Sequence, residues 1–278
     1  MRKIGAHVSS AGGPQFAIKN ILQIGGNCLQ IFAGSPRTWA RRLYTPSEFD
    51  QFNLLATKHE LYPVFIHGLY LVNLGSDNPD TLMKSYDALL CDLQNGDLIN
   101  SAGVIVHLGS HQGRGFATVK KLVVDQIRSL LNNSRTTPFL IENSSYQQGK
   151  IGTIEELHEI FDALSHPRLK ICLDTAHLFE AGFNLIDTQA VADLVDQLDR
   201  FNLLNSIACI HLNDSKTKLN SRHDQHANLG EGEVGLPGLR NFVTHPAFSD
   251  IPLILEVPGE NKTGPDTKNI LAAQSLIN

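Results

Sequence analysis

Six short apolar runs in this chain each end at a residue that can bind a metal ion. The runs are three or four residues long, and their endings are His67, His107, Glu142, Asp174, His211 and Glu256. Runs of this length are too short for a helix and are typical of buried parallel strands. Burying an ionisable group at such a place is costly unless a partner or a metal ion compensates it. Because imidazole and carboxylate together bind zinc, manganese or iron, the six endings predict a shared metal site.

Three more candidate ligands extend this set. His177 lies three residues after Asp174, so a helical turn would place both side chains on one side, able to bind adjacent ions. Asp224 and His226 are two apart, and an extended segment would point both onto one ion. The nine candidates exceed what one four- or five-coordinate zinc uses, and Glu142 is a carboxylate that can bridge two ions. Two or three clustered divalent ions are the usual solution for phosphoryl chemistry.

The elements that must position these ligands are strands and helices in alternation. Two further apolar runs, Ile4 to Val8 and Cys28 to Phe32, precede the six and bring the number of expected strands to eight. Helical patterns with apolar periodicity occur at 46–60, 80–95, 116–133, 153–164 and 187–201, and Thr153 with Glu156 forms a capping box. Strand–helix alternation of this kind predicts a (β/α)8 TIM barrel, in which all strand ends face one mouth. We expect one such domain over 1–278 with the metal site at that mouth. The alternative is a doubly wound sheet, which gathers ligands at one switch point only.

Composition is that of an ordinary soluble globular protein, with 42% hydrophobic and 18% charged residues. No apolar stretch approaches the length of a membrane span, and the start has no secretory signal pattern, so no membrane association is expected.

The four cysteines are scattered along the chain. Cys28, Cys172 and Cys209 lie in apolar runs and should be buried and reduced, which favours a cytoplasmic location. The net charge of −5 does not exclude nucleic acid, because three bound divalent ions would reverse its sign.

The remaining histidines have simpler interpretations. Four lie in expected helices or Pro-flanked loops and should be surface residues: His59, His158, His166 and His245. Three lie near the expected mouth without ending a clear run, and we expect them to support ligands rather than bind metal: His7, His111 and His223. Any single strand ending is better explained as a satisfied core polar residue. The six endings together favour metal.

Longer motifs carry a family resemblance. In order and spacing the chain resembles, along nearly its whole length, the endonuclease IV family of apurinic/apyrimidinic DNA endonucleases. The matching segments are IGAHVSSAGG (4–13), PRTW (36–39), HGLYLVNLG (67–75), HLGSH (107–111), IENS (141–144), CLDTAH (172–177), HLNDSK (211–216), RHDQHANLGEG (222–232) and IPLILE (251–256).

The resemblance implies a TIM barrel with three zinc ions, or manganese in part. His67, His107 and Glu142 would hold the first ion, and bridging Glu142 would hold the second with Asp174, His211 and Glu256. The third would be bound by His177, Asp224 and His226. Glu142 and Glu256 would be central to catalysis. The implied reaction cleaves double-stranded DNA at the phosphodiester 5′ to an abasic site, leaving 3′-hydroxyl and 5′-deoxyribose phosphate ends. We expect a monomer.

DNA contacts are expected on two patches. The resemblance implies that Arg37 and Tyr70, on the loops after the second and third strands, enter the DNA near the lesion. Arg37 lies beside Trp39 and before Arg41 and Arg42, a basic–aromatic cluster able to contact phosphates and stack on bases. Lys216, Lys218 and Arg222 form a second candidate patch for phosphate contacts. Solvated charged loops are the alternative interpretation of both patches.

Four places depart from the family pattern. Gln225 stands between Asp224 and His226 where family members usually carry Arg, which removes a cation near an expected DNA phosphate. The loop 142–150 is longer and bulkier by Tyr146, and Gly68 and Leu69 alter the loop that carries Tyr70. Ala176 in place of a common Cys should be harmless. All nine ligands remain, so we expect metal binding and cleavage with altered DNA engagement.

Two other functions compete with this interpretation. A xylose-isomerase-like sugar isomerase or epimerase shares the topology but needs only one or two ions, which leaves Asp224, His226 and the PRTW loop unexplained. A DNA-damage binder that has lost turnover is the non-enzymatic alternative. Fold alone does not separate these functions, whereas metal stoichiometry and nicking of an abasic duplex do.

Overall fold

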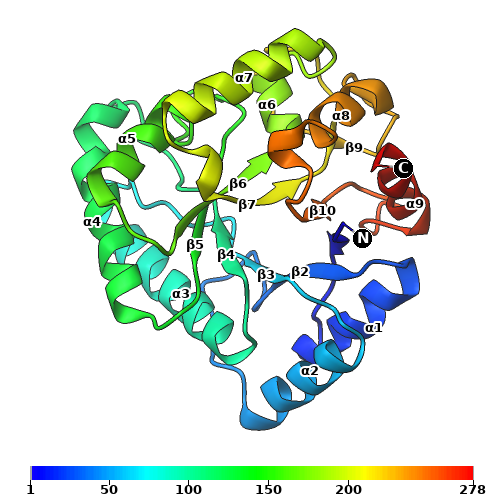
Figure 1. Cartoon of the computed structure of the whole chain (residues 1–278). Helices are drawn as coiled ribbons and strands as arrows, with labels where there is room; N and C mark the ends of the chain where they lie inside the picture. The colour runs from blue at the N-terminus through cyan, green and yellow to red at the C-terminus, as the bar shows by residue number, and fades with distance from the viewer. Residues whose placement is uncertain (1, 278) are drawn as a thin grey trace.

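The computed structural model describes residues 2–277, and these form a closed barrel of parallel strands surrounded by helices (Figure 1). All eight expected apolar runs are barrel strands. They are β1 (Ile4–His7), β2 (Cys28–Phe32), β3 (Val64–His67), β4 (Gly103–Val106), β5 (Phe139–Glu142), β6 (Leu169–Asp174), β7 (Ile207–His211) and β10 (Leu253–Leu255). Because β1 pairs with both β2 and β10, the sheet closes, and the doubly wound alternative is wrong. That one domain spans 1–278 stays a prediction, and residues 1 and 278 lie outside the described part.

The helices lie outside the barrel (Figure 1). The five expected helices are present within a few residues of their predicted ends: α2 (Pro46–Lys58), α3 (Pro79–Leu98), α4 (Phe116–Asn133), α5 (Ile154–Leu164) and α7 (Thr188–Arg200). The capping box is also present, because Thr153 accepts from the Glu156 N–H and Glu156 accepts from the Thr153 N–H. Four helices were not predicted: α1 (Pro14–Ile24), α6 (Thr175–Ala181), α8 (Gly235–Val243) and α9 (Thr267–Ile277). Two 3-10 turns, η1 (Leu204–Ser206) and η2 (Pro246–Phe248), complete the helical elements of the described chain.

The two-residue period of the strands separates the core into an outer and an inner part. On β3, Val64 and Ile66 belong to the cluster between barrel and helices, whereas Phe65 belongs to a separate cluster inside the barrel. That inner cluster is a plug of seven buried residues: Cys28, Phe65, Ile105, Leu140, Cys172, Cys209 and Ile254. Since alternate residues of a strand face the same side, the residue two positions after each plug residue also faces inward. On six strands that residue is an expected ligand.

The cysteines are free, and the three that lie in apolar runs are fully buried in this plug, as predicted. One element at the mouth was not foreseen, a short antiparallel ribbon of β8 (Asp214–Ser215) and β9 (His226–Ala227). Within residues 2–277 we find no helix of the length and apolarity that a membrane crossing needs.

Candidate metal centre

The expected ligands gather at the carboxyl ends of the strands in three overlapping groups. In each group, one ligand atom from every residue lies within 4.8 Å of the others. The first group is His67, His107 and Glu142; the Nε2 atoms of both histidines lie 3.3 Å from Oε2 of Glu142. This is the set that the resemblance implies for the first ion.

The second group is Glu142, Asp174, His211 and Glu256. Nδ1 of His211 lies 3.0 Å from Oε1 of Glu142 and 3.3 Å from Oε2 of Glu256. The same Nδ1 lies 3.9 Å from Oδ2 of Asp174. Glu142 therefore presents one oxygen to each group, an arrangement suited to a bridging carboxylate.

The third group is Asp174, His177 and His226, and Asp224, which the resemblance assigns to the third ion, lies beside this group. Oδ1 of Asp224 lies 3.2 Å from Nε2 of His177 and 3.7 Å from Nε2 of His226. Asp174 also belongs to this group, because its Oδ2 lies 3.5 Å from Nε2 of His226. The structure thus brings Asp174 to two groups, whereas the sequence analysis assigned it to one. Asp224 differs from the other ligands in its setting, since half of its side chain is exposed.

Helix α6 explains how Asp174 and His177 come to face the same space. Asp174 ends β6 and is also the N-cap of α6, accepting a hydrogen bond from the backbone N–H of His177 at 2.9 Å. The strand therefore passes into a helix without a connecting loop. His177 lies in the first turn of that helix, three residues on, where the spacing keeps it beside Asp174.

The hydrogen bonds of the histidine rings leave one nitrogen of each ring facing the centre. Nδ1 of His67 donates to the Gly68 carbonyl at 2.7 Å, and Nδ1 of His177 donates to the Asn143 carbonyl at 3.0 Å. Nε2 of His211 donates to Oε1 of Gln30 at 2.8 Å. Metal-binding histidines have this pattern, in which one ring nitrogen is fixed by an acceptor and the other is presented to the ion.

Two buried nitrogen atoms test whether the site suits metal ions. Nε2 of His177 and Nε2 of His226 have no hydrogen-bond partner among the described residues, although the Asp224 carboxylate lies near both. Ligands held 2.0–2.2 Å from a tetrahedral ion lie about 3.4 Å apart, the spacing found between atoms across the groups. Unpaired buried nitrogens at this spacing fit metal coordination and do not fit a self-satisfied polar core.

Charge in the centre is dominated by Glu142. Burial by itself would raise the pKa of Glu142, but His107, His211 and His67 hold it well below its ordinary value. For His211, burial acts to lower the pKa, and Glu256 with Glu142 raises it well above its ordinary value. The carboxylate is therefore strongly favoured in its ionised form, which is the form that binds a cation.

Three supporting residues escaped the sequence analysis. Gln30 on β2 connects two ligands, since its amide donates to Oε1 of Glu256 at 2.6 Å while its carbonyl accepts from His211. Asn213 donates to Oδ2 of Asp174 at 2.7 Å and accepts the backbone N–H of Glu256 at 2.8 Å. Asn143 accepts the backbone N–H of Asp174 at 2.7 Å. The sequence feature that could have identified them is a polar residue within or directly after an apolar run.

The outcome for the other histidines is mixed. His7 ends β1, contrary to expectation, and its Nδ1 accepts from Gln30 and lies 3.4 Å from Glu256, so it supports that ligand. His111 accepts the backbone N–H of Gly115 and holds a loop. His158 is not a simple surface residue, because it is half-buried and its ring stacks on Phe201 with the centroids 4.4 Å apart. His59 and His223 are exposed, whereas His166 and His245 are partly buried.

The residues that we expect to contact DNA differ in exposure. Arg37 and Tyr70 are exposed on the loops after β2 and β3, and the Tyr70 N–H donates to the Pro36 carbonyl at 3.3 Å. The basic–aromatic cluster is wrong for Arg41, whose side chain is only 6% exposed and faces Asp92. Arg42 pairs with Glu48, and Trp39 packs against the core. Among the described residues of this loop, Arg37 is the exposed basic side chain that does not face a carboxylate.

The second patch has the expected exposure. Lys216, Lys218 and Arg222 are exposed on the loop between β8 and β9, and Gln225 is exposed on the same loop. Tyr146, the bulky residue of the 142–150 loop, packs against the start of α5. Its hydroxyl accepts the Ile154 N–H and donates to Glu155, which folds the ring back onto the start of α5.

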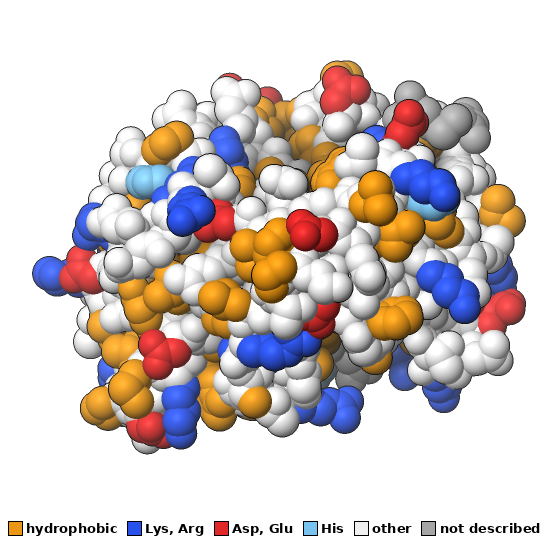
Figure 2. Space-filling view, turned by 90° about the horizontal axis from the view of Figure 1, so that it is seen from below, with side chains coloured by type: hydrophobic (Ala, Val, Ile, Leu, Met, Phe, Trp, Pro, Cys, Tyr) orange, Lys and Arg blue, Asp and Glu red, His pale blue; other side chains and the backbone are white. Residues whose placement is uncertain are grey.

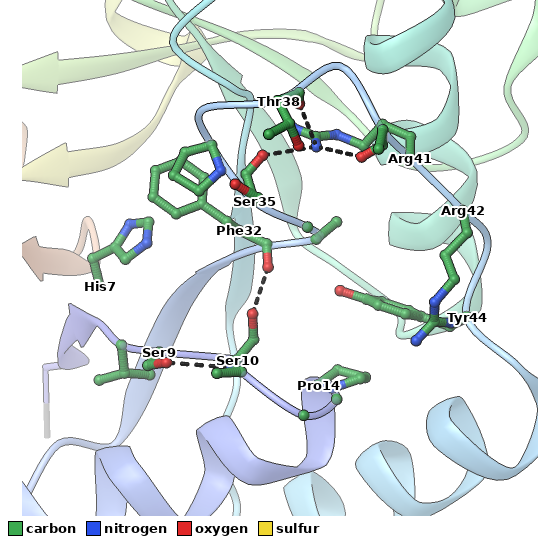
Figure 3. A pocket seen from close by; sticks show the side chains of 18 residues that line it. His7, Ser9, Ser10, Pro14, Phe32, Ser35, Thr38, Arg41, Arg42 and Tyr44 are labelled. Carbon is green, nitrogen blue, oxygen red and sulfur yellow. Dashed lines mark hydrogen bonds between the residues drawn. The ribbon is translucent and has the colours of Figure 1, made fainter.

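A cavity of about 860 Å³ lies beside the centre, between the loops that follow β1 and β2 (Figure 3). His7 forms its inner end, and Arg41, Arg42 and Tyr44 form part of its far side (Figure 3). On the face shown in Figure 2, basic, acidic and apolar side chains are interspersed. That mixture is not the continuous basic stripe expected of a DNA-binding face.

Comparisons with known proteins agree with this geometry. A family profile described as a xylose isomerase-like TIM barrel matches residues 18–277. A probable endonuclease 4 from Halothermothrix orenii is 35% identical over 259 residues, which cover 92% of this chain and 93% of the relative. A probable endonuclease 4 from Haloarcula marismortui is 36% identical over 265 residues, 94% of each chain.

Solved structures give the same result. The crystal structure of endonuclease IV from Thermus thermophilus is similar with a TM-score of 0.87 and 32% identity, covering 99% of this chain and 98% of that one. Sugar epimerases of the same architecture, such as 3-keto-D-glucoside 4-epimerase from E. coli at 15% identity, share the fold alone. From these relationships, the chain belongs to the endonuclease IV family.

Proposed function

We propose that this hydrolase cleaves double-stranded DNA at abasic sites. The reaction is hydrolysis of the phosphodiester 5′ to the lesion, leaving 3′-hydroxyl and 5′-deoxyribose phosphate ends. The observation that carries the proposal is the Glu142 carboxylate, which faces two ligand groups at once while a third group adjoins through Asp174. Membership of the endonuclease IV family supports a DNA substrate for such a centre.

Three divalent ions would be held by the nine ligands. Zinc fits the mixture of imidazole and carboxylate, and manganese would fit the carboxylate-rich second group in part. When bound, such ions lower the pKa of a water molecule toward about 7 and stabilise charge on the leaving oxygen. His67 and His107 would hold the first ion with Glu142. Asp174, His211 and Glu256 would hold the second with Glu142, and His177, Asp224 and His226 the third.

The residues of this chain orient the reaction in two ways. Glu142 fixes the separation of the first two ligand groups, because both of its oxygens are engaged and the side chain is fully buried. Glu256 lies on the more open side of the centre, and Gln30 and Asn213 fix it from the side chain and the backbone. We infer that Glu256 faces the scissile phosphate while Glu142 keeps the site assembled.

DNA would approach over the mouth of the barrel. Arg37 and Tyr70 lie on neighbouring loops that are joined by the Tyr70–Pro36 hydrogen bond, and would enter the duplex at the lesion. Lys216 and Arg222 would contact phosphates from the other side. Selection of the lesion needs no reading of base edges, because an abasic nucleotide is readily extruded from the stack.

Two alternatives are weaker. A sugar isomerase or epimerase of this fold would need one or two ions, and the neighbouring side chains of His177, Asp224 and His226 would then have no use. A non-catalytic DNA-damage binder would not need Glu142 in the bridging position. Neither alternative accounts for both the third group and the shared carboxylate.

The test combines nicking with metal analysis. Protein purified without chelator should nick a duplex containing one abasic analogue and leave an intact duplex of the same sequence uncut. Elemental analysis should find three metal ions per chain. One ion or fewer, with no uptake of added zinc or manganese, would contradict the trinuclear centre, and binding without nicking would favour the non-catalytic alternative.

A further inference from the structure

The loop that carries Arg37 contains neither helix nor strand in the described structure. It spans residues 33–45 between β2 and α2. A segment of this length without regular backbone pairing needs another source of order, because its carbonyl groups must find donors and its conformational entropy must be overcome. The loop also bears Trp39, the single tryptophan of the chain.

The order comes from one side chain at the centre of the loop. Nη1 of Arg41 donates to the carbonyls of Ser35, Thr38 and Ala40 at 2.9, 3.3 and 3.0 Å (Figure 3). The guanidinium therefore substitutes for the backbone donors that a helix or strand would supply. Its bonds bracket the turn, with the Ser35 carbonyl before Arg37 and the Thr38 and Ala40 carbonyls on either side of Trp39.

Helix α3 fixes the guanidinium from beneath. Nε of Arg41 lies 3.3 Å from Oδ1 of Asp92, which is fully buried on α3, and the contact is an ion pair without a hydrogen bond, since neither Nε nor either Asp92 oxygen has a hydrogen-bond partner among the described residues. Three residues on, and so on the same helix face, Asn95 accepts the backbone N–H of Tyr44 at 2.8 Å and donates to the Arg42 carbonyl at 3.0 Å. The loop is thus attached to a rigid helix at successive points, and the Arg41–Asp92 pair is its ionic attachment.

We propose that Asp92 and Arg41 form a positioning pair that sets the Arg37 loop for DNA, an inference that rests on the proposed function. Neither residue is placed to reach the reacting atoms. Their role is to fix the loop geometry before DNA arrives, so that Arg37 and the attached Tyr70 do not have to be ordered during binding. A loop that is held in its binding conformation in this way increases the affinity for DNA and does not change the chemical step.

The ionic character of the pair supports this role over simple stability. A buried ion pair seldom adds stability over well-packed apolar residues, because desolvating both charges offsets their attraction. Burial raises the pKa of Asp92 to about 7, and the Arg41 guanidinium opposes that rise. What the pair provides is a guanidinium held beside Asp92, with its Nη1 facing three carbonyls of the loop.

The first arm of the test uses Trp39 and needs no DNA. Asp92→Asn keeps the size of the side chain and removes its charge, so the Arg41 guanidinium should lose its fixed orientation. Trp39 emission should then shift to the red and become more accessible to acrylamide. Asp80→Asn, an exposed carboxylate on the same helix that pairs with Lys84, is the matched control and should behave as wild type.

The second arm measures steady-state nicking of an abasic duplex. In Asp92→Asn we expect KM to rise about tenfold, comparable to losing one base-stacking or phosphate contact, with kcat and metal content unchanged. Arg41→Gln serves as a second variant if Asp92→Asn fails to fold, since a lone buried Asp92 can take up a proton. It should give the same increase in KM and the same change in Trp39.

The outcomes separate the two proposals. Unchanged KM and unchanged Trp39 quenching in both variants would overturn the positioning role. A fall in kcat at constant KM, or loss of metal, would assign the pair to the metal centre and overturn it equally. If wild type does not nick abasic DNA, the proposed function fails, whereas Trp39 still reports whether the pair orders the loop.

Discussion

The inner and outer parts of the metal centre are built from the same residue types but are held very differently. Inside, Glu142, Asp174 and His211 are fully buried, and strands or a helix cap fix their backbones. Outside, His107 is 36% exposed and Asp224 is 50% exposed, and Asp224 stands on a loop. The inner ligands are therefore held rigidly by their strands or helix cap, whereas the positions of the outer ligands depend on the contacts that hold their loops.

This difference indicates a division of labour. Rigid strand ends suit the bridging position, where small displacements would separate two ions. Loops suit contacts to DNA, which must adapt to a distorted duplex and can change between relatives without loss of the fold. Of the departures from the family pattern, Gln225 and Tyr146 lie in the outer part, whereas Gly68, Leu69 and Ala176 are buried. The following changes test this division in order of decreasing effect.

Glu142→Gln changes a ligand of the inner part and should have the largest effect. The amide keeps the size of the side chain but cannot bridge two cations with two charged oxygens. We expect turnover on an abasic duplex to fall by several orders of magnitude, with weaker metal retention after dialysis. Near-normal cleavage by this variant would show that the proposed centre is wrong. Glu256→Gln should lose turnover similarly, while retaining some metal.

Gln30→Leu tests the support of the inner part without removing a ligand. Gln30 fixes both His211 and Glu256, so its loss should leave the donor Nε2 of His211 unpaired and free the Glu256 carboxylate. We expect about a 10- to 100-fold loss in zinc affinity or turnover, the range found for groups that orient metal ligands. Gln189→Leu, at an exposed position of α7, is the control. If both variants resemble wild type, the Gln30 bonds do not orient the ligands.

Gln225→Arg adds a cation to the outer part of the centre and should have the smallest effect of these changes. The added cation would lie near an expected phosphate, and each such contact steepens the salt dependence of binding by about 0.9 in logarithmic slope. We expect tighter abasic-duplex binding at moderate salt, with single-turnover cleavage at saturating enzyme little changed. Unchanged affinity and slope would mean that Lys216, Lys218 or Arg222 already neutralises that phosphate.

The inner part was also the more predictable part. Each of its ligands follows an apolar strand, and the period of two along a strand places it on the inner face whatever the loops do. After Asp174 the sequence suggested a helical turn but not a full helix, because its start signal, the N-cap Asp174, is also a candidate ligand. Helix α8 contains Gly235, Pro237 and Gly238, which indicate a turn, and packing against α7 and α9 overrides them.

The outer part shows where sequence reasoning fails. Arg41 and Arg42 read as one basic cluster with Arg37, yet Arg41 lies inward against Asp92, a residue 51 positions later on α3. Tyr146 makes the 142–150 loop bulkier, and the sequence does not show that its hydroxyl bonds to the start of α5. Side chains on loops have no periodicity to fix their direction, so their orientation depends on partners that are distant in sequence.

The sequence by itself therefore determined the eight strands, the barrel and a set of candidate ligands at the strand ends, because burial and periodicity are local properties of the chain. Only the tertiary structure decided how the ligands share their atoms: that Asp174 belongs to two groups, that Gln30 connects His211 with Glu256, and that Arg41 orders a loop instead of facing solvent. These are long-range pairings, and closure of the barrel brings their members together.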